Sequence, residues 1–158
     1  MEHQPLADKL RPQTLDEIVG QEHLCGKNGV LRRMLSAGRV SNMIYSGPPG
    51  VGKTTVARIV AKSSGLSFHQ LNATTASLSD VKDIAAAAGN VFGANGILLY
   101  LDEIQYFNKK QQQSLLSYME DGRIVLVAST TENPYLYIYS AILSRSSVFE
   151  FKPVAPEA

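Results

Sequence analysis

Apolar residues gather along this chain in short continuous runs, separated by stretches in which they recur every three or four positions. The most continuous run, Ile-Leu-Leu-Tyr-Leu at 97–101, is typical of a parallel strand that is buried on both faces. Shorter runs of the same kind predict four further strands, over about residues 42–46, 67–71, 124–128 and 148–151.

The stretches between the predicted strands have the apolar spacing of amphipathic helices. They predict helices over about residues 29–37, 53–63, 79–88, 108–120 and, less regularly, 133–143. Asn108 with Gln111 three positions later resembles a capping box, and Ser79 or Asp80 can cap the third of these helices. A short helix is also predicted over about 15–19.

Strands and helices alternate through most of the chain. This order predicts an α/β fold in which a five-stranded parallel sheet lies between layers of helices. Ligands of such sheets bind at the carboxyl ends of the strands. Candidate functional residues are therefore expected directly after strands, and the sequence places several of them there.

The turn after the first predicted strand matches the P-loop pattern G-x-x-x-x-G-K-[ST] at every fixed position, from Gly47 to Thr54. The glycines allow a tight turn whose N–H groups point at one anion, and the following helix adds the partial positive charge of its N-terminus. Lys53 is predicted to reach the β- and γ-phosphates of ATP, and the Thr54 hydroxyl to bind Mg²⁺. Further nucleotide contacts are expected from Pro49, Gly50, Val51, Gly52 and Thr55.

The third predicted strand ends in Asp102 and Glu103, which correspond to the second half of a P-loop ATPase site. Asp102 is expected to hold Mg²⁺, directly or through water. Glu103 is expected to polarise the water that attacks the γ-phosphate. Adjacent residues at a strand end point in different directions, so the two carboxylates can take different roles.

Polar residues near three other strand ends complete the candidate site. Thr131, or Thr130 beside it, can hold the γ-phosphate or the attacking water from the side. Asn72 can bond Glu103 and hold it away from the water, although such a residue also suits a strand-terminating turn. Arg145 precedes the last strand and can reach the γ-phosphate of a neighbouring subunit in a ring.

The amino-acid composition indicates the general class of protein but says little about its function. The chain has 158 residues, 44% of them hydrophobic, which suffices for one domain with a core. A net charge of +1 gives no strong global field toward nucleic acid or membrane, but a ring assembly can still have a local basic lining. A single cysteine, Cys25, fits a reducing compartment, and no apolar run reaches membrane-spanning length, so a cytoplasmic protein without membrane contact is expected.

Two further features lie outside the P-loop site. Tyr135, Tyr137 and Tyr139 alternate with aliphatic residues, and they can either stack on nucleic-acid bases or pack an irregular helix against its neighbours. The three histidines have no metal-ligand spacing with Cys25 or with acids, so no zinc site is expected.

With these residues assembled, the chain resembles the ATPase core of the RarA/MgsA family of AAA+ proteins. These are bacterial relatives of the Werner-helicase-interacting ATPase and are close to clamp loaders. The resemblance covers nearly the whole chain and rests on the P-loop and on seven other stretches, 5–12, 15–24, 71–73, 101–104, 107–112, 130–134 and 143–146. The leader at 15–24 and the Thr-Thr-Glu-Asn-Pro segment at 130–134 are fairly specific to this branch, whereas the P-loop motifs indicate only a P-loop ATPase.

The resemblance implies a fold and a set of site residues. The fold is a three-layer, RecA-like core with strand order 5-1-4-3-2, which places the second strand beside the third. The leader would wrap the adenine around Arg11, Ile18 and Val19. Thr131 would be the sensor 1 residue, and Arg145 the arginine finger that acts in trans. ATP and Mg²⁺ are the implied cofactors.

The resemblance also implies a domain organisation. Residues 1–27 would be the leader of the adenine site, 28–152 the AAA+ core, and 153–158 the start of a linker. A helical lid with a sensor 2 arginine and a C-terminal oligomerisation domain would follow, so the chain is interpreted as a fragment that hydrolyses ATP weakly by itself. One departure is Ser147, because the family often has a second arginine two residues after the finger.

The implied function is DNA-dependent ATP hydrolysis in replication-fork maintenance, recombination and DNA repair. The implied partners are single-stranded or forked DNA, the single-stranded-DNA-binding protein and further copies of the chain in a homotetramer. The implied location is the cytoplasm, in association with the nucleoid.

Rival functions explain fewer of these residues. The leader and the 130–134 segment argue against a clamp-loader subunit or a branch-migration motor. Asp102 and Glu103 argue against a nucleotide-dependent recruitment scaffold, which needs no catalytic glutamate. A P-loop kinase has no role for the leader or for Arg145.

Overall fold

The centre of the protein is a five-stranded parallel sheet in the order β2-β3-β4-β1-β5. The computed structural model describes residues 14–15, 18, 20–27, 29–38, 40–88 and 96–153. The strands are β1 (Met43–Ser46), β2 (Ser67–Asn72), β3 (Ile97–Asp102), β4 (Ile124–Thr130) and β5 (Ser147–Glu150). The predicted α/β class and strand order are confirmed.

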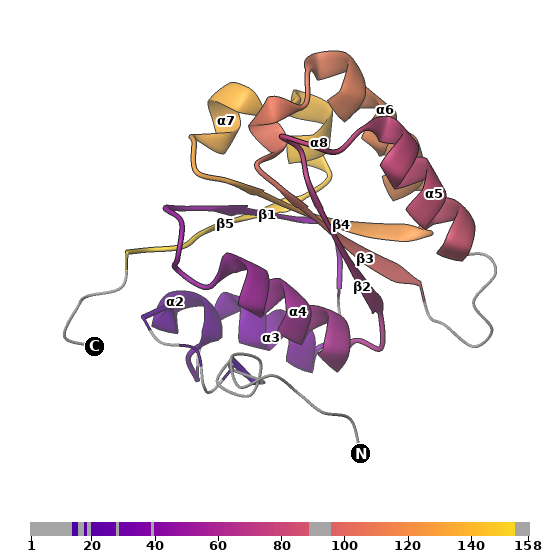
Figure 1. Ribbon diagram of the computed structural model, residues 1–158. Helices are drawn as coiled ribbons and strands as arrows, with labels where there is room; N and C mark the ends of the chain where they lie inside the picture. Colours follow the sequence, from indigo (N-terminus) through magenta and orange to yellow (C-terminus); the bar gives the residue numbers. More distant parts are fainter. Residues whose placement is uncertain are drawn as a thin grey trace, which may run out of the picture.

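Helices cover both faces of the sheet and complete three layers (Figure 1). One face carries α2 (Glu22–Cys25), α3 (Val30–Ser36) and α4 (Lys53–Ser63). The other face carries α5 (Leu78–Ala88), α6 (Lys109–Glu120), α7 (Pro134–Tyr137) and α8 (Ser140–Ser144). A short 3₁₀ helix, η2 (Ile104–Tyr106), joins β3 to α6. None of the helices in the described ranges is long and apolar enough to cross a membrane.

The continuous apolar runs follow from this layered arrangement, because strands covered on both faces bury every side chain. Within β1, Met43 and Tyr45 pack on the side of α2–α4, whereas Ile44 packs on the side of α5–α8. Within β3, Leu98 and Leu99 divide between the two sides in the same way.

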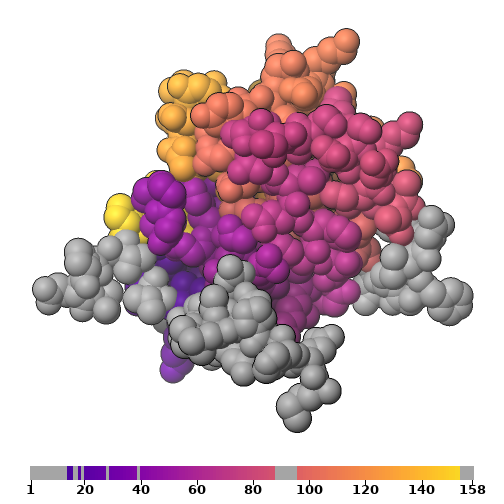
Figure 2. Space-filling view, in the orientation of Figure 1, coloured from indigo at the N-terminus to yellow at the C-terminus, as the bar shows by residue number. Residues whose placement is uncertain are grey.

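Parallel pairing brings the carboxyl ends of the strands to one edge of the sheet. Ser46, the last residue of β1, lies beside Thr130 of β4 and Glu150 of β5. Asn72, the last residue of β2, lies beside Asp102 of β3. In the space-filling view, the gold atoms of α7 lie at the same margin of the molecule as the violet P-loop (Figure 2).

Some predicted helix boundaries are wrong. The helix α5 begins at Leu78, before both predicted caps, because Asp80 accepts a hydrogen bond from the Ser77 N–H at 2.8 Å and caps the helix from within its first turn. The irregular helix predicted over 133–143 is two short helices with Ile138 in an extended conformation between them. The predicted capping box of Asn108 is confirmed.

Two further elements differ from the sequence prediction. The strand β4 extends through Thr130, beyond its predicted end at 128, since β1 continues to pair with it at Ser129 and Thr130. The four-residue helix α2 was not predicted, and its shortness leaves no apolar period to detect. The helix predicted over 15–19 lies mostly outside the described residues.

The buried amide of Gln112 generates a stability prediction. Its Nε2 atom donates to the carbonyls of Phe107 and Tyr137 at 3.0 and 3.2 Å, and its Oε1 atom accepts from the Tyr139 N–H at 2.7 Å. The substitution Gln112→Leu leaves these backbone groups without their partner, so we expect the free energy of unfolding to fall by about 1–3 kcal/mol, measured by urea denaturation. The exposed neighbour Gln113 provides the control: Gln113→Leu should change the free energy of unfolding by less than about 0.5 kcal/mol. Equal losses in the two variants would contradict the prediction.

Candidate nucleotide-binding site

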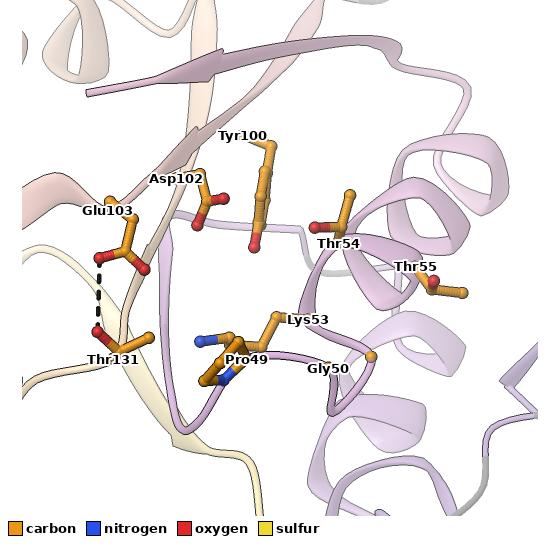
Figure 3. A pocket seen from close by; sticks show the side chains of 10 residues that line it. Pro49, Gly50, Lys53, Thr54, Thr55, Tyr100, Asp102, Glu103 and Thr131 are labelled. Atoms are coloured by element: carbon orange, nitrogen blue, oxygen red, sulfur yellow. Dashed lines mark hydrogen bonds between the residues drawn. The ribbon is translucent and has the colours of Figure 1, made fainter. Parts of the chain in front are cut away.

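The carboxyl edge of the sheet is hollowed beside the P-loop. A cavity of about 420 Å³ lies between the start of α4 and the ends of β3 and β4 (Figure 3). It is lined by loop and helix residues on one side and strand-end residues on the other: Pro49, Gly50, Gly52, Lys53, Thr54, Thr55, Tyr100, Asp102, Glu103 and Thr131. Most of the predicted phosphate-, metal- and water-binding residues therefore line one cavity.

The P-loop conformation depends on glycine at two points. Gly52, directly before α4, has φ 97° and ψ 11°, a left-handed conformation that residues with a side chain rarely adopt. At Gly47, a Cβ atom would lie 2.5 Å from the carbonyl oxygen of Phe151, so the loop passes too close to the segment after β5 for a side chain. The two glycines let the chain turn from β1 into α4, whose N-terminus carries a partial positive charge suited to phosphate.

The ammonium group of Lys53 is held by neutral backbone oxygens. Its Nζ atom donates to the carbonyl of Gly47 at 2.5 Å and to that of Thr130 at 3.4 Å, and the residue is 7% exposed. Burial lowers the pKa of Lys53, and the nearby carboxylates of Asp102 and Glu103 oppose that shift. The carbonyl dipoles neutralise the positive charge of Lys53 only in part. A phosphate in the cavity would supply the negative charge that neutralises it more fully.

Oxygen atoms suited to a magnesium ion gather between β3 and the start of α4. The Asp102 carboxylate and the Thr54 hydroxyl line the cavity, and Figure 3 shows the Tyr100 ring pointing into it between them. Ser129 donates a hydrogen bond to Asp102 Oδ1, and burial raises the pKa of the Tyr100 hydroxyl. Carboxylate and hydroxyl oxygens are hard ligands that fit Mg²⁺.

Glu103 has an unusual backbone conformation. Its φ of 56° and ψ of 51° are left-handed, and no other residue with a side chain has a positive φ among the residues described. Such a conformation costs about 1–3 kcal/mol and tends to occur at functional sites. Its carboxylate accepts from the Thr131 hydroxyl at 3.4 Å, the dashed line in Figure 3, and from the side-chain amide of Gln105.

The two candidate threonines after β4 differ in position. Thr131 is exposed and lines the cavity. Thr130 is fully buried, and its hydroxyl donates to Gln105 Oε1 at 2.7 Å. The geometry therefore favours Thr131 for contact with phosphate or water, and its role in catalysis stays a prediction.

Asn72 does not take its predicted place on Glu103. It lies beside Asp102 in the sheet, and its Oδ1 atom accepts from the backbone N–H and the hydroxyl of Thr74 at 2.9 and 2.6 Å. These bonds stabilise the turn that follows β2, which is the alternative that the sequence had left open. The described side-chain bonds of Glu103 go to Gln105 and Thr131 instead.

Arg145 lies directly after α8, and it is not among the residues that line the cavity. Its guanidinium group lies 2.9 Å from the carboxylate of Glu120, at the end of α6, and the two side chains are 45% and 53% exposed. An exposed ion pair of this kind contributes about 0–1 kcal/mol, so it does not commit Arg145 to this partner. A role in a neighbouring subunit's site stays a prediction.

The adenine contacts expected from the leader fall largely elsewhere. Arg11 and Val19 lie outside the described residues. Ile18 lines a second cavity of about 360 Å³ together with Leu15 and Cys25, apart from the phosphate side of the P-loop. Contact of Ile18 with adenine therefore stays a prediction.

Gln21 links the leader to the P-loop. It is 1% exposed, and its Nε2 atom donates to the carbonyls of Val51 and Lys152 at 3.3 and 2.8 Å. Its Oε1 atom accepts from the Lys152 N–H at 3.0 Å. Val51, a predicted nucleotide contact, is itself buried and is not among the residues lining the cavity, so its visible contribution is to hold the loop.

The sequence of this domain matches a known protein family. Residues 10–135 match the family described as the Holliday junction DNA helicase RuvB P-loop domain, and this match spans most of the chain. The chain belongs to this family.

Solved RuvB structures have the same fold as this RuvB-type P-loop domain. A Thermotoga maritima RuvB mutant matches with a TM-score of 0.73 and 30% identity, over 92% of this chain and 50% of that one. The Thermotoga maritima RuvB Holliday junction branch migration motor matches with a TM-score of 0.68 and 30% identity, over 90% and 48% of the two chains.

Sequence relatives of the domain have longer chains. The Replication-associated recombination protein A of Bacillus subtilis is 40% identical over 153 residues, which is 97% of this chain and 36% of the relative. The protein of the same name from Coxiella burnetii is 41% identical over 94% and 33% of the two chains, and ATPase WRNIP1 of Dictyostelium discoideum is 37% identical over 97% and 18%. The chain thus spans about a third or less of these relatives, and the predicted resemblance to the RarA/MgsA family of AAA+ P-loop ATPases is confirmed.

Three residues of the RuvB-type site were missed from the sequence. Tyr100 lines the cavity, Ser129 bonds Asp102, and Gln105 bonds Glu103. Tyr100 could have been found, because it precedes Asp102 by two positions on a strand and so points to the same side. Gln105 lies in a 3₁₀ turn without a recognisable signal, and Ser129 required the pairing of β3 with β4 to be known.

The thiol of Cys25 generates a prediction for the second cavity. Burial raises its pKa from 9.0 to about 11, and the cation of Arg32 opposes that shift. Because the thiolate is the reactive form, we expect Cys25 at pH 8 to react about 100-fold more slowly with a disulfide reagent in the native protein than in urea. The raised pKa also means that this group stabilises the fold below pH 9, and that the contribution is lost as the pH rises from 9.0 to about 11.

Stopped-flow absorbance would measure the Cys25 reaction rates, and Cys25→Ser gives the baseline. Equal rates in the native and unfolded protein at pH 8 would contradict the prediction.

Proposed function

We propose that this domain binds and hydrolyses ATP as the core of a DNA-dependent ATPase in replication-fork maintenance, recombination and DNA repair. The observation that carries the proposal is the shared cavity of Lys53, Thr54, Asp102, Glu103 and Thr131. A cation, metal-binding oxygens and a water-polarising carboxylate together are the groups that phosphoryl transfer to water requires.

The P-loop side of the cavity would bind the phosphates. Backbone N–H groups at the start of α4 would donate to phosphate oxygens, and Lys53 would exchange its carbonyl partners at Gly47 and Thr130 for the β- and γ-phosphates. Thr54 and Asp102 would hold Mg²⁺, which supplies neutralising charge to the phosphate oxygens when bound.

The strand-end side would position the nucleophile. A water molecule beside Glu103 attacks the γ-phosphorus, the bond from that phosphorus to the bridging oxygen of ADP breaks, and the proton of the water passes to the Glu103 carboxylate and then to solvent. The Thr131 hydroxyl, which bonds Glu103, would orient the water or a γ-phosphate oxygen. Charge that develops on the bridging oxygen would be stabilised by Lys53.

The role on DNA is supported by the relatives. Two are named replication-associated recombination protein A, and a structural neighbour is named as a branch migration motor. The resemblance supports forked or single-stranded DNA and the single-stranded-DNA-binding protein as partners, a homotetramer as the assembly, and the cytoplasm, near the nucleoid, as the location. The exposed position of Arg145 supports its use as an arginine finger between copies.

Loss of ATP binding in Lys53→Ala tests the phosphate site. We expect calorimetry with ATP and Mg²⁺ to show saturable binding to the chain and an affinity about 10–100-fold lower in Lys53→Ala, because a charge-assisted contact of about 1.5–3 kcal/mol is removed. Lys62→Ala, at the exposed opposite end of α4, is the matched control and should bind as the wild type does. Equal affinities for wild type and Lys53→Ala would overturn the assigned site.

Mixing two inactive variants of a longer protein that carries this domain tests the action of Arg145 in trans. Arg145→Ala should lower the turnover of ATP by on the order of 10³-fold. Adding Glu103→Gln subunits, which are inactive but keep Arg145, should restore turnover at about a quarter of the interfaces in a 1:1 mixture. Each ring interface joins two different faces, so an active one needs a subunit with Glu103 on one side and a subunit with Arg145 on the other.

The matched control for that experiment is Arg123→Ala, since Arg123 is also exposed and ion-paired, in its case with Asp121. Arg123→Ala should keep wild-type turnover. A mixture that is no more active than its two components would show that Arg145 does not act between subunits.

The RuvB matches favour branch migration as a second candidate function. A mobile four-way junction incubated with ATP and the longer protein distinguishes it, because a branch-migration motor would separate the junction into two duplexes. Stimulation of ATP turnover by forked DNA without junction separation would favour fork maintenance. A recruitment scaffold, the third alternative, would keep its biological activity in Glu103→Gln.

A further inference from the structure

Gln105 connects the carboxylate of Glu103 to the buried end of β4. It lies in η2, two residues after Glu103, and it is half-buried. Its Nε2 atom donates to Glu103 Oε2, and its Oε1 atom accepts from the Thr130 hydroxyl at 2.7 Å. One side chain thus bridges a cavity-lining residue and a residue with no exposed surface.

The hydrogen bonds around Thr130 fix the orientation of the Gln105 amide. The Glu132 N–H donates to Thr130 Oγ1 at 3.0 Å, so the hydroxyl proton is available to a second partner. That partner must be an acceptor, which places the Gln105 oxygen toward Thr130 and its NH₂ group toward Glu103. In the reverse orientation, the Gln105 amide oxygen would face the Glu103 carboxylate, so that two acceptors met. Its NH₂ group would face the hydroxyl proton of Thr130, so that two donors met.

The anchor of this bridge, Thr130, is buried and paired within the sheet. Thr130 is the last residue of β4, pairs with Ser46 of β1, and has no exposed surface. Its carbonyl accepts from Lys53 Nζ at 3.4 Å, while its hydroxyl donates to Gln105. Thr130 therefore contacts both the residue that would bind phosphate and the residue that holds Glu103.

The bridge leaves one carboxylate oxygen for the water. Gln105 and Thr131 both bond Oε2 of Glu103, and in Figure 3 the other carboxylate oxygen points into the cavity. Glu103 also needs such support because its left-handed backbone is costly to maintain. Gln105 is not among the residues that line the cavity, so its effect on the reaction must act through Glu103.

We propose that Gln105 is a positioning residue for the hydrolysis, and that the Thr130–Gln105 bridge holds Glu103 with one oxygen turned to the attacking water. This inference rests on the proposed ATPase function. The proposed role of Gln105 differs from the one that the sequence had suggested for Asn72, which was to hold Glu103 away from the water.

Steady-state ATP turnover by the longer protein in the presence of DNA tests the proposal. Gln105→Glu is nearly isosteric, keeps an acceptor for Thr130, and replaces the donor toward Glu103 by a carboxylate oxygen. We expect its kcat to fall by about 10–100-fold, and its KM for ATP to stay within about twofold of the wild-type value. The reason is that a positioned general base raises the rate by about 10²–10⁴-fold, and a misplaced Glu103 would lose part of that rate enhancement. Gln113→Glu on the exposed face of α6 is the matched control and should keep wild-type kcat.

A double-mutant cycle separates positioning from a merely structural role. If Gln105 acts through Glu103, the variant Glu103→Gln with Gln105→Leu should turn over ATP no more slowly than Glu103→Gln alone. A structural role would lower kcat further in the double variant, and it would lower ATP affinity as well. Thr130→Val should reproduce a part of the loss, because it removes the donor that orients the amide.

The outcomes distinguish this inference from the function on which it rests. If the wild type turns over ATP and Gln105→Glu matches it in kcat, the positioning role is wrong and the ATPase stands. The contrary result is a wild type with no ATP turnover above that of Lys53→Ala and Glu103→Gln. That result would overturn both the ATPase function and the positioning role of Gln105. Should Gln105→Leu fail to fold, the comparison of Gln105→Glu with Gln113→Glu still decides the question.

Discussion

The parallel pairing of β1 with β4 and of β4 with β3 is the constraint on which the site depends. It brings three strand ends to one edge, so that residues far apart in the sequence line a cavity of about 420 Å³. Loss of this register would separate Lys53 from Asp102 and Glu103 without changing any local motif. The two hydrophobic layers, which bury both faces of every central strand, are what maintain the pairing.

Electrostatics inside the cavity follow from that enclosure. Lys53 is buried among backbone carbonyls, and burial lowers its pKa while two neighbouring carboxylates oppose the shift. The arrangement places the incompletely neutralised ammonium group of Lys53 near the carboxylate oxygens of Asp102 and Glu103. The proposed ligand, a nucleotide phosphate with a divalent cation, would be complementary to both groups.

Amide side chains that are buried or half-buried join the elements around the site. Gln21 joins the leader, the P-loop and the segment after β5, and Gln112 joins α6 to the segment between α7 and α8. Gln105 joins η2 to β4. Each amide satisfies donors and acceptors that the irregular segments would otherwise leave without partners, so these connections hold loops in place that secondary structure alone does not fix.

The sequence by itself determined the P-loop, the acidic strand end and the α/β class, because glycine spacing, apolar runs and helix periodicity are local properties. The tertiary structure decided which polar residues act together: it bonded Gln105 to Glu103, turned Asn72 toward its own loop and paired Arg145 with Glu120. The physical reason is that a hydrogen bond depends on positions within a few tenths of an ångström. Such positions result from sheet register and helix packing across the whole domain, which no short stretch of sequence encodes.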